Sequence, residues 1–172
     1  LKSLAINVIT FNFTTSNFNS MGIAEELKQS HFQTEATKAV VNVIYTGNWI
    51  IQRQQEMFKP FGVTMQQYNV LRILKGQQGK PMTVLAITER MLDRMSNASR
   101  LVDKLLEKQL VERRQCPNDR RAVDIVILPA GLALLERMEG DLKKLGQKIE
   151  AMGNENLEQL NHLLDQFRTS IF

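Results

Sequence analysis

The spacing of apolar residues along the chain predicts a mainly helical protein. From about residue 34 to residue 59 they recur at steps of three and four, the period of a helix with one apolar face. Thr34 is the expected N-cap, and Pro60 and Gly62 end the pattern. The apolar stripe of this helix consists of Ala36, Val40, Val43, Ile44, Gly47, Ile50, Ile51, Met57 and Phe58.

Three shorter helices are predicted in the middle of the chain. The first begins at Thr64, the second is capped by Thr83, and residues 76–81 form the turn between them. The third covers residues 95–108. Two short helices with a brief connection, of which the second has a polar face, are typical of a helix-turn-helix.

A short β-hairpin follows the third helix directly. Its expected strands are residues 110–113 and 122–128, and the basic tip between them is residues 114–121. This arrangement suits DNA, because the helix can enter a major groove while the tip reaches the neighbouring minor groove.

The terminal part of the chain predicts two more amphipathic helices. Pro129 is the expected first helical residue of a long one, and Gly153 with Asn154 breaks the pattern before the last one. Their stripes are Leu135, Met138, Leu142, Leu145, Ile149 and Met152, then Leu157, Leu160, Leu163, Leu164, Phe167 and Ile171. Together with the first helix they exceed what one small domain can cover, which favours a dimer interface over a larger monomeric core.

The helix over residues 95–108 has one apolar and one polar side. Ser96, Asn97, Ser99, Arg100 and Lys104 lie mainly on the polar side, most of them near the N-terminal end, which is the half that contacts base edges in a helix-turn-helix. An ordinary surface helix with a solvated face has the same pattern. The adjoining hairpin favours the DNA-binding interpretation.

The charge distribution agrees with a phosphate-binding surface in this region. Residues 90–121 carry nine Lys and Arg against five Asp and Glu, a net charge of +4, whereas residues 122–172 carry five against eight, a net charge of −3. A difference of a few charges is also compatible with chance. The basic excess per residue is nevertheless greatest in the helix and hairpin.

Composition restricts the alternatives. The chain has 172 residues, no apolar run long enough for a transmembrane helix, and one cysteine, Cys116, which excludes an intramolecular disulfide and fits a reducing cytoplasm. Residues 1–20 are rich in Asn, Ser and Thr and precede Met21, so we expect an extension derived from cloning or upstream translation; a secretory signal fits them less well.

No catalytic constellation is evident. His31 and His162 lie far apart and lack nearby ligand partners, and the sequence has no Gly-rich phosphate loop or nucleophile elbow. We therefore expect no enzyme activity, no metal and no cofactor. Tyr45 and Trp49, four residues apart, could line a ligand pocket together with Tyr68, although such aromatic residues are more often packing residues.

Around the hairpin the sequence resembles the MarR family of multiple-antibiotic-resistance-type transcriptional regulators. The resemblance covers roughly residues 34–172, and its motifs occur in the family's order and spacing. The most specific segments are residues 110–113, 117–123 and 129–131, with residues 100–105 matching the recognition helix. Asp119 and Arg121 match the family's Asp-x-Arg wing signature.

The resemblance implies a mainly α protein in which residues 61–128 form a winged helix-turn-helix domain. Residues 33–60 and 129–172 would supply the dimerisation helices of a homodimer bound to a pseudo-palindromic operator. Such a bacterial regulator is expected to be a repressor that binds double-stranded DNA, and a small phenolic or lipophilic effector would release it. The alternative is a winged helix that binds proteins without reading DNA sequence.

The resemblance also implies roles for individual residues. Arg121 would enter the minor groove, Arg120 would contact a phosphate, and Asp119 would orient the wing. Arg100 is the best candidate for a guanine contact, and it could instead pair with Asp103 or a phosphate.

Three positions depart from the family pattern. Gln109 replaces a usual glycine, and Leu128 replaces a usual threonine cap, so that Pro129 carries more of the helix initiation. Cys116 lies in the wing, away from the first helix where oxidation-sensing members keep their cysteine. Neighbouring arginines could lower its pKa, but we expect a passive, exposed thiol.

Overall fold

The computed structural model describes residues 22–171 except 30, 94 and 117–118, and at 116, 119–122 and 171 it describes the backbone alone. The expected N-terminal extension therefore lies outside the described residues. The chain divides into two compact units, Leu1–Ile50 and Ile51–Phe172. No helix in the described part of the chain is both long and apolar enough to cross a membrane.

The first unit contains a short helix, α1 (Ile23–Glu26), and most of α2 (Glu35–Phe58). The hydroxyl oxygen of Thr34 accepts a hydrogen bond from the Thr37 N–H at 3.0 Å, as expected for an N-cap. The Tyr45 hydroxyl donates to Glu26 Oε2 at 2.9 Å and joins the two helices. The sequence pattern did not predict α1.

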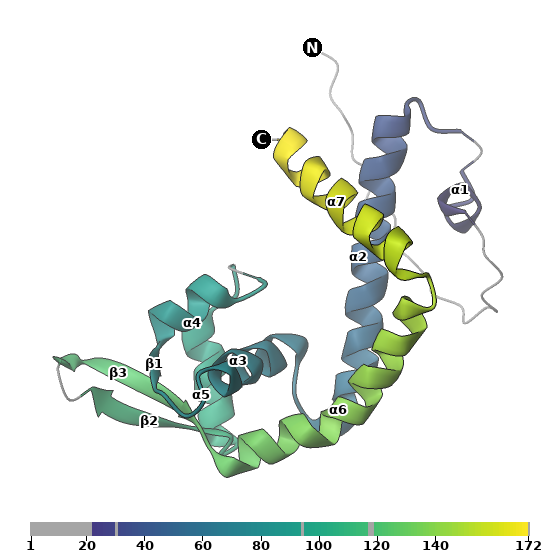
Figure 1. Ribbon diagram of the computed structural model, residues 1–172. Coiled ribbons are helices and arrows are strands. Elements are labelled where there is room, and N and C mark those ends of the chain that lie inside the picture. The colour runs from purple at the N-terminus through teal and green to yellow at the C-terminus, as the bar shows by residue number, and fades with distance from the viewer. Residues whose placement is uncertain (1–21, 30, 94, 117–118, 172) are drawn as a thin grey trace. The chain divides into compact units, whose positions relative to one another are not determined.

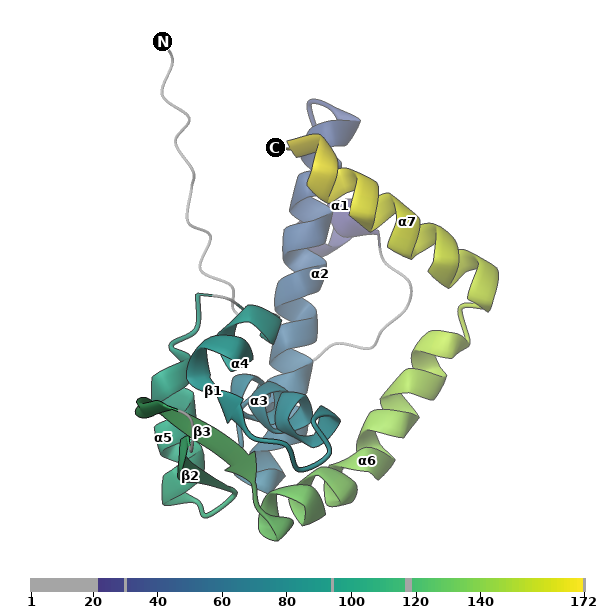
Figure 2. The ribbon, with the colours of Figure 1, turned by 60° about the vertical axis from the view of Figure 1, so that its left-hand side comes forward.

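Three helices of the second unit pack together, as Figure 2 shows: α3 (Met65–Gly76), α4 (Val84–Arg90) and α5 (Ala98–Glu107). Before α3, the single turn η1 (Lys59–Phe61) ends at Gly62 in a left-handed conformation, φ 67°. Thr64 and Gln67 form a reciprocal capping box at the start of α3, and Thr83 caps α4. The predicted cap at Thr83 is confirmed, and α5 begins three residues later than expected.

A three-stranded antiparallel sheet flanks these helices, with the order β1–β3–β2 (Figure 1). Its strands are β1 (Met82–Thr83), β2 (Val111–Cys116) and β3 (Asp119–Ile127). Strands β2 and β3 are longer than the predicted ones, so that Arg114, Arg120 and Arg121 belong to strands and not to an extended tip. The sequence did not predict β1, because two residues are too few to show an alternating pattern.

The core of the second unit lies between α3, α4, α5, the sheet and the first turns of α6 (Pro129–Glu150). Its fully buried members come from every one of these elements. They include Phe58, Val70, Leu71, Leu74, Ile87, Val102, Leu105, Val111, Ile125 and Met138. Phe58, which ends α2, is the member of this core that precedes α3.

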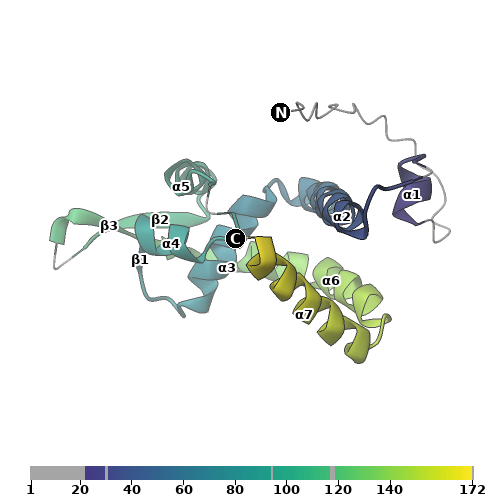
Figure 3. The ribbon, with the colours of Figure 1, turned by 90° about the horizontal axis from the view of Figure 1, so that it is seen from above.

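The C-terminal helices extend beyond this core. Pro129 stands at the start of α6, and Leu128 makes no side-chain cap bond, as predicted. Gly153, with φ 85°, separates α6 from α7 (Asn154–Ile171). In Figure 3 the hairpin of β2 and β3 extends to the side of the second unit opposite α6 and α7. Leu135 and Met138 are buried, whereas Ile149 and Met152 are about half exposed, so that the first part of the predicted seam is the better covered by the described residues.

A close approach at Gly131 fixes the start of α6. A Cβ atom at this position would lie 2.4 Å from the Leu110 carbonyl oxygen and 2.8 Å from Ile127 Cγ1. We predict that Gly131→Ala lowers the free energy of unfolding by about 1–3 kcal/mol, because backbone atoms must move to admit the methyl group. Urea denaturation measures the change.

Gly140 supplies the matched control on the same helix, because a Cβ atom there would meet nothing within 4 Å. Gly140→Ala should raise stability by about 0.5–1 kcal/mol through the better helix propensity of alanine. Equal effects of the two substitutions would contradict the packing argument.

Gln109 retains the left-handed conformation that the family's usual glycine would adopt, with φ 56°. We predict that Gln109→Gly raises the free energy of unfolding by about 1 kcal/mol, because the strain of a side chain in this conformation is removed. Gln109→Ala, which keeps a Cβ atom, should give no such gain. A loss of stability on Gln109→Gly in thermal unfolding would refute this explanation.

Candidate nucleic-acid interface

Helix α5 presents a polar face to solvent and an apolar face to the core. Ala98, Val102 and Leu105 are at most 4% exposed. The exposed residues along the helix are Ser99, Arg100, Asp103, Lys104 and Glu107. Ser99, Arg100 and Lys104, three of the predicted DNA-binding residues, therefore lie together on one accessible surface of a single helix.

Ser96 and Asn97 precede α5 and do not belong to it. Asn97 is its N-cap, and Asn97 Oδ1 accepts from the Arg100 N–H at 3.1 Å. The Ser96 hydroxyl donates to Asp93 Oδ2 at 2.6 Å. Asn97 can still offer a base its side-chain amide nitrogen as a donor and one lone pair of Oδ1, and the Ser96 hydroxyl retains acceptor capacity.

Ion pairs on α5 determine which charges remain for a ligand. Lys104 Nζ contacts both carboxylate oxygens of Glu107, at 2.8 and 3.0 Å. Asp103 pairs at 2.5 Å with Arg113 of β2 and not with Arg100. Arg100 makes no ion pair with any side chain in the described part of the chain. Its guanidinium is thus the cation of this face best placed to contact a base or a phosphate.

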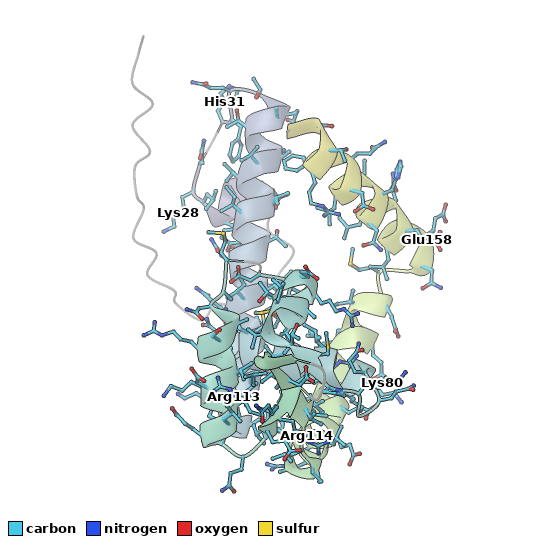
Figure 4. All side chains as sticks on the ribbon, turned by 90° about the vertical axis from the view of Figure 1, so that its left-hand side faces the viewer. Lys28, His31, Lys80, Arg113, Arg114 and Glu158 are labelled. Atoms are coloured by element: carbon cyan, nitrogen blue, oxygen red, sulfur yellow. The ribbon has the colours of Figure 1, made fainter. Side chains whose placement is uncertain are left out.

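The hairpin adds basic side chains beside α5. Arg113 and Arg114, both labelled in Figure 4, are consecutive residues of β2, and successive side chains of a strand point to opposite faces, so that Arg113 is the one that reaches Asp103 of α5. Arg114 forms an ion pair with Glu112 of the same strand. The side chains of Asp119, Arg120, Arg121 and Cys116 lie outside the described residues, and their expected roles stay predictions.

Three hydrogen bonds hold the two ends of α5 to α3 and the turn before it. Asn69 Oδ1 accepts from the Leu92 N–H at 3.1 Å, in the connection between α4 and α5. At the other end of α5, Lys108 Nζ donates to the Gly62 carbonyl and, at 3.1 Å, to Gln67 Oε1. These contacts fix both ends of α5 without using groups on its exposed face.

The predicted ligand-pocket residues occur in both units. Tyr45 and Trp49 are half-buried in the first, and Tyr68 lies in the second with its ring centroid 5.0 Å from that of Phe58. Burial, reinforced by Glu26, raises the pKa of the Tyr45 phenol. Burial also raises the pKa of Tyr68, although Arg72 acts in the opposite direction. A shared ligand pocket stays a prediction.

Metal ligation has no support among the residues that the structure describes, since they contain no cluster of three or more His, Cys, Asp or Glu side chains suited to an ion. His31 and His162 do not belong to such a cluster.

Comparison with protein families identifies the helix-turn-helix and hairpin. Residues 63–123, which contain α3, β1, α4, α5, β2 and the start of β3, match the sequence model of the MarR family. This segment is a MarR-family region. The resemblance inferred from the wing and recognition-helix motifs is confirmed.

A curated relative agrees with this assignment. The chain is 27% identical over 139 residues to a protein of Bacillus subtilis (strain 168) described as an uncharacterised HTH-type transcriptional regulator, YhbI. The match covers 74% of this chain and 88% of the relative.

Solved structures of MarR-family proteins share the fold. A MarR transcription factor from Planctomyces limnophilus is 27% identical, with a TM-score of 0.60 over 79% of this chain and 99% of its own. AbsC, a MarR family regulator from Streptomyces coelicolor, is 21% identical, with a TM-score of 0.67 over 83% and 98%. MepR of S. aureus, solved as a complex with DNA, is 19% identical, with a TM-score of 0.67 over 77% and 96%. The predicted winged helix fold is confirmed.

Sequence reasoning missed one residue of the MarR-family region that organises the interface. Asp93 accepts from the Met95 N–H at 3.0 Å and from the Ser96 hydroxyl, and thereby shapes the turn before α5. An aspartate two and three residues before a donor is the usual signal for such a turn. It was overlooked because a helix was expected to begin at residue 95.

These bonds favour the ionised form of the Asp93 carboxyl. The hydrogen bond from Ser96, followed by that from the Met95 N–H, lowers the pKa of the Asp93 carboxyl below its ordinary value near 3.8. Because the folded pKa is depressed, the stabilising effect of the carboxylate is complete above the unfolded pKa and disappears as the pH falls through the folded one. We predict a carboxyl-carbon NMR titration midpoint below 3.8 in the folded chain.

Ser96→Ala is the control for this titration, because it removes the first of the two bonds. The Asp93 midpoint of that variant should move back toward 3.8. A midpoint at or above 3.8 in the unsubstituted protein would be inconsistent with the hydrogen-bonded turn.

Proposed function

We propose that the protein is a sequence-specific, double-stranded-DNA-binding transcriptional regulator that acts as a homodimer, as a repressor, on a pseudo-palindromic operator. The observation that carries the proposal is the exposed polar face of α5 beside the basic strand β2. The N-terminal half of α5 enters a major groove, where Asn97, Ser99 and Arg100 contact base edges and phosphates. The hairpin β2–β3 reaches the adjacent minor groove with Arg121, while Arg120 contacts the backbone and Asp119 orients the wing.

Several features support DNA as the ligand. Arg100 is exposed, and its acidic neighbour Asp103 pairs with Arg113, so that binding a phosphate or guanine does not require an existing ion pair on α5 to break. Lys104 can exchange its exposed pair with Glu107 for a phosphate at little cost, because such surface pairs contribute little stability. The similar MepR structure was solved with DNA bound.

Uncovered apolar side chains support the homodimer. Val40, Val43, Ile44, Ile50 and Ile51 of α2 are 40–58% exposed although they repeat at helical spacing. Leu160 and Leu163 of α7 are 42% and 52% exposed. A row of exposed apolar residues usually marks a surface that another chain covers. A second copy of this chain related by two-fold symmetry would also match the two half-sites of an inverted-repeat operator.

Release from DNA by a small phenolic or lipophilic effector completes the proposal. The half-buried aromatic residues Tyr45, Trp49 and Tyr68 are its candidate contacts, because aromatic side chains with polar tips both pack against and hydrogen-bond such ligands.

The test of the proposed function is selection of bound fragments from random duplex DNA by the full chain at moderate salt. Enrichment of an inverted repeat with half-sites about one helical turn apart is the expected result. Affinity for that duplex should fall steeply with salt as counterions are released. Absence of DNA binding would overturn the proposal and favour a protein-binding winged helix.

Two arginine substitutions distinguish the major-groove from the minor-groove contact. Arg100→Ala should weaken binding by about 1–3 kcal/mol and relax the preference at one base pair of each half-site. Arg121→Ala should weaken binding by a similar amount, about 1–3 kcal/mol, mainly on duplexes with A·T-rich flanks. Fluorescence anisotropy with the selected duplex and with flank variants measures both.

Lys143 on α6 provides the matched control, since it is exposed and lies outside the proposed interface. Lys143→Ala should leave operator affinity and thermal stability unchanged. Unchanged affinity of Arg121→Ala would refute the assignment of the wing.

A further inference from the structure

The turn that precedes α5 carries an apolar side chain in an unusual environment. Met95 is 95% exposed, more than any other large apolar residue in the described part of the chain, although it stands only two residues before the N-cap of α5. Single exposed apolar residues are common on protein surfaces. Met95 differs because its backbone is held in place by hydrogen bonds.

Four hydrogen bonds order this turn. Asp93 Oδ1 accepts from the Met95 N–H at 3.0 Å, Asp93 Oδ2 accepts from the Ser96 hydroxyl at 2.6 Å, and the Asp93 carbonyl accepts from the Ser96 N–H at 3.2 Å. The fourth bond, from the Leu92 N–H to Asn69 at 3.1 Å, ties the turn to α3. The Met95 backbone is thus fixed relative to the helix-turn-helix while its side chain is in water.

We propose that Met95 is a specificity-determining residue that packs against the C5 methyl group of a thymine in each half-site, and that Asp93 and Ser96 are its positioning residues. The inference rests on the proposed function, because it adds a contact to the same protein–DNA interface.

The major groove offers one apolar group, the thymine methyl, and this group marks an A·T pair. A methionine suits the contact because its unbranched, polarisable side chain adapts to an irregular surface. Moving an apolar side chain out of water is favourable. Met95 is exposed in the free protein, so its burial against a thymine methyl group would contribute to the free energy of DNA binding.

The assignment changes the role expected of Ser96. Its hydroxyl donates its proton to Asp93, and its side chain is only partly exposed. Ser96 therefore acts on DNA through the conformation of the turn, whereas Ser99 and Arg100 on the exposed face of α5 contact DNA directly.

The experiment measures full-length protein on the duplex obtained by selection, with each thymine of one half-site replaced in turn by uracil. This replacement removes the methyl group and leaves base pairing unchanged. For the unsubstituted protein, one position should lose affinity by about fourfold, the factor that corresponds to one buried methyl group. For Met95→Gln, which keeps the length of the side chain but makes it polar, the same replacement should have no effect.

Two control variants separate this contact from general effects. Met95→Leu keeps an apolar side chain and should keep the uracil penalty at the same position. Leu85 of α4 is also exposed, at 69%, but lies outside the turn, so that Leu85→Gln should show the full penalty.

The same comparison of thymine with uracil tests the two positioning residues. Asp93→Asn and Ser96→Ala should reduce the uracil penalty at the Met95 position while the base preference attributed to Arg100 remains. Ser96→Thr, which retains the hydroxyl, should restore the penalty. Equal losses at every base pair would mean a merely structural role and would contradict the positioning assignment.

The outcomes distinguish this inference from the proposed function. If no duplex is selected, the proposed function itself fails. If a duplex is selected but no uracil replacement weakens binding, or if Met95→Gln retains the penalty of the unsubstituted protein, the Met95 contact is refuted while sequence-specific binding stands.

Discussion

The junction at Leu110 is the constraint on which the arrangement of the second unit depends. The Leu110 N–H donates to the Leu105 carbonyl at the end of α5, and the Leu110 carbonyl accepts from the Leu128 N–H, each at 3.0 Å. The same carbonyl oxygen lies where a side chain at Gly131 would have to be. One residue therefore connects α5, the base of the hairpin and the first turn of α6, and these elements cannot move independently there.

The exposed polar side of α5 contributes little to holding the helix in place. Its apolar side is buried, its two ends are held by Asn69 and Lys108, and its acidic residues are neutralised by Lys104 and Arg113. Among the described side chains on and just before this face, Arg100, Asn97 and Ser99 take part in no ion pair.

Much of the fold could be predicted because it follows from local patterns. Thr34 and Thr83 cap the helices that they were expected to cap, a helix begins at Thr64 as expected, and Pro129 begins α6. The residues of the wing and recognition-helix motifs were also sufficient to identify the MarR-family region. Apolar periodicity, helix caps and family motifs each involve residues close together in the sequence, so they can be recognised without knowing the tertiary structure.

The features that escaped prediction depend on partners distant in sequence or on alternatives to a helix. Strand β1 exists because Met82 and Thr83 pair with Ile125 and Asp124, some forty residues later. The start of α5 was placed too early because Met95 and Ser96 continue a helical pattern, whereas Asp93 binds their donors in a turn. The hairpin strands were predicted too short because the polar residues of β2 hide its alternation.

Thr83 belongs to two structures at once, since it pairs with Asp124 in the sheet and caps α4 through its bond to the Ala86 N–H. The sheet thereby fixes the residue at which α4 begins, and the connecting residues 77–80 are not needed to fix it. Insertions or deletions in this connection change its length without displacing the helices that follow, since extra loop residues cost little closure entropy. Over evolution, the turn between α3 and β1 is therefore a place where related chains can differ in length and still read DNA with the same geometry.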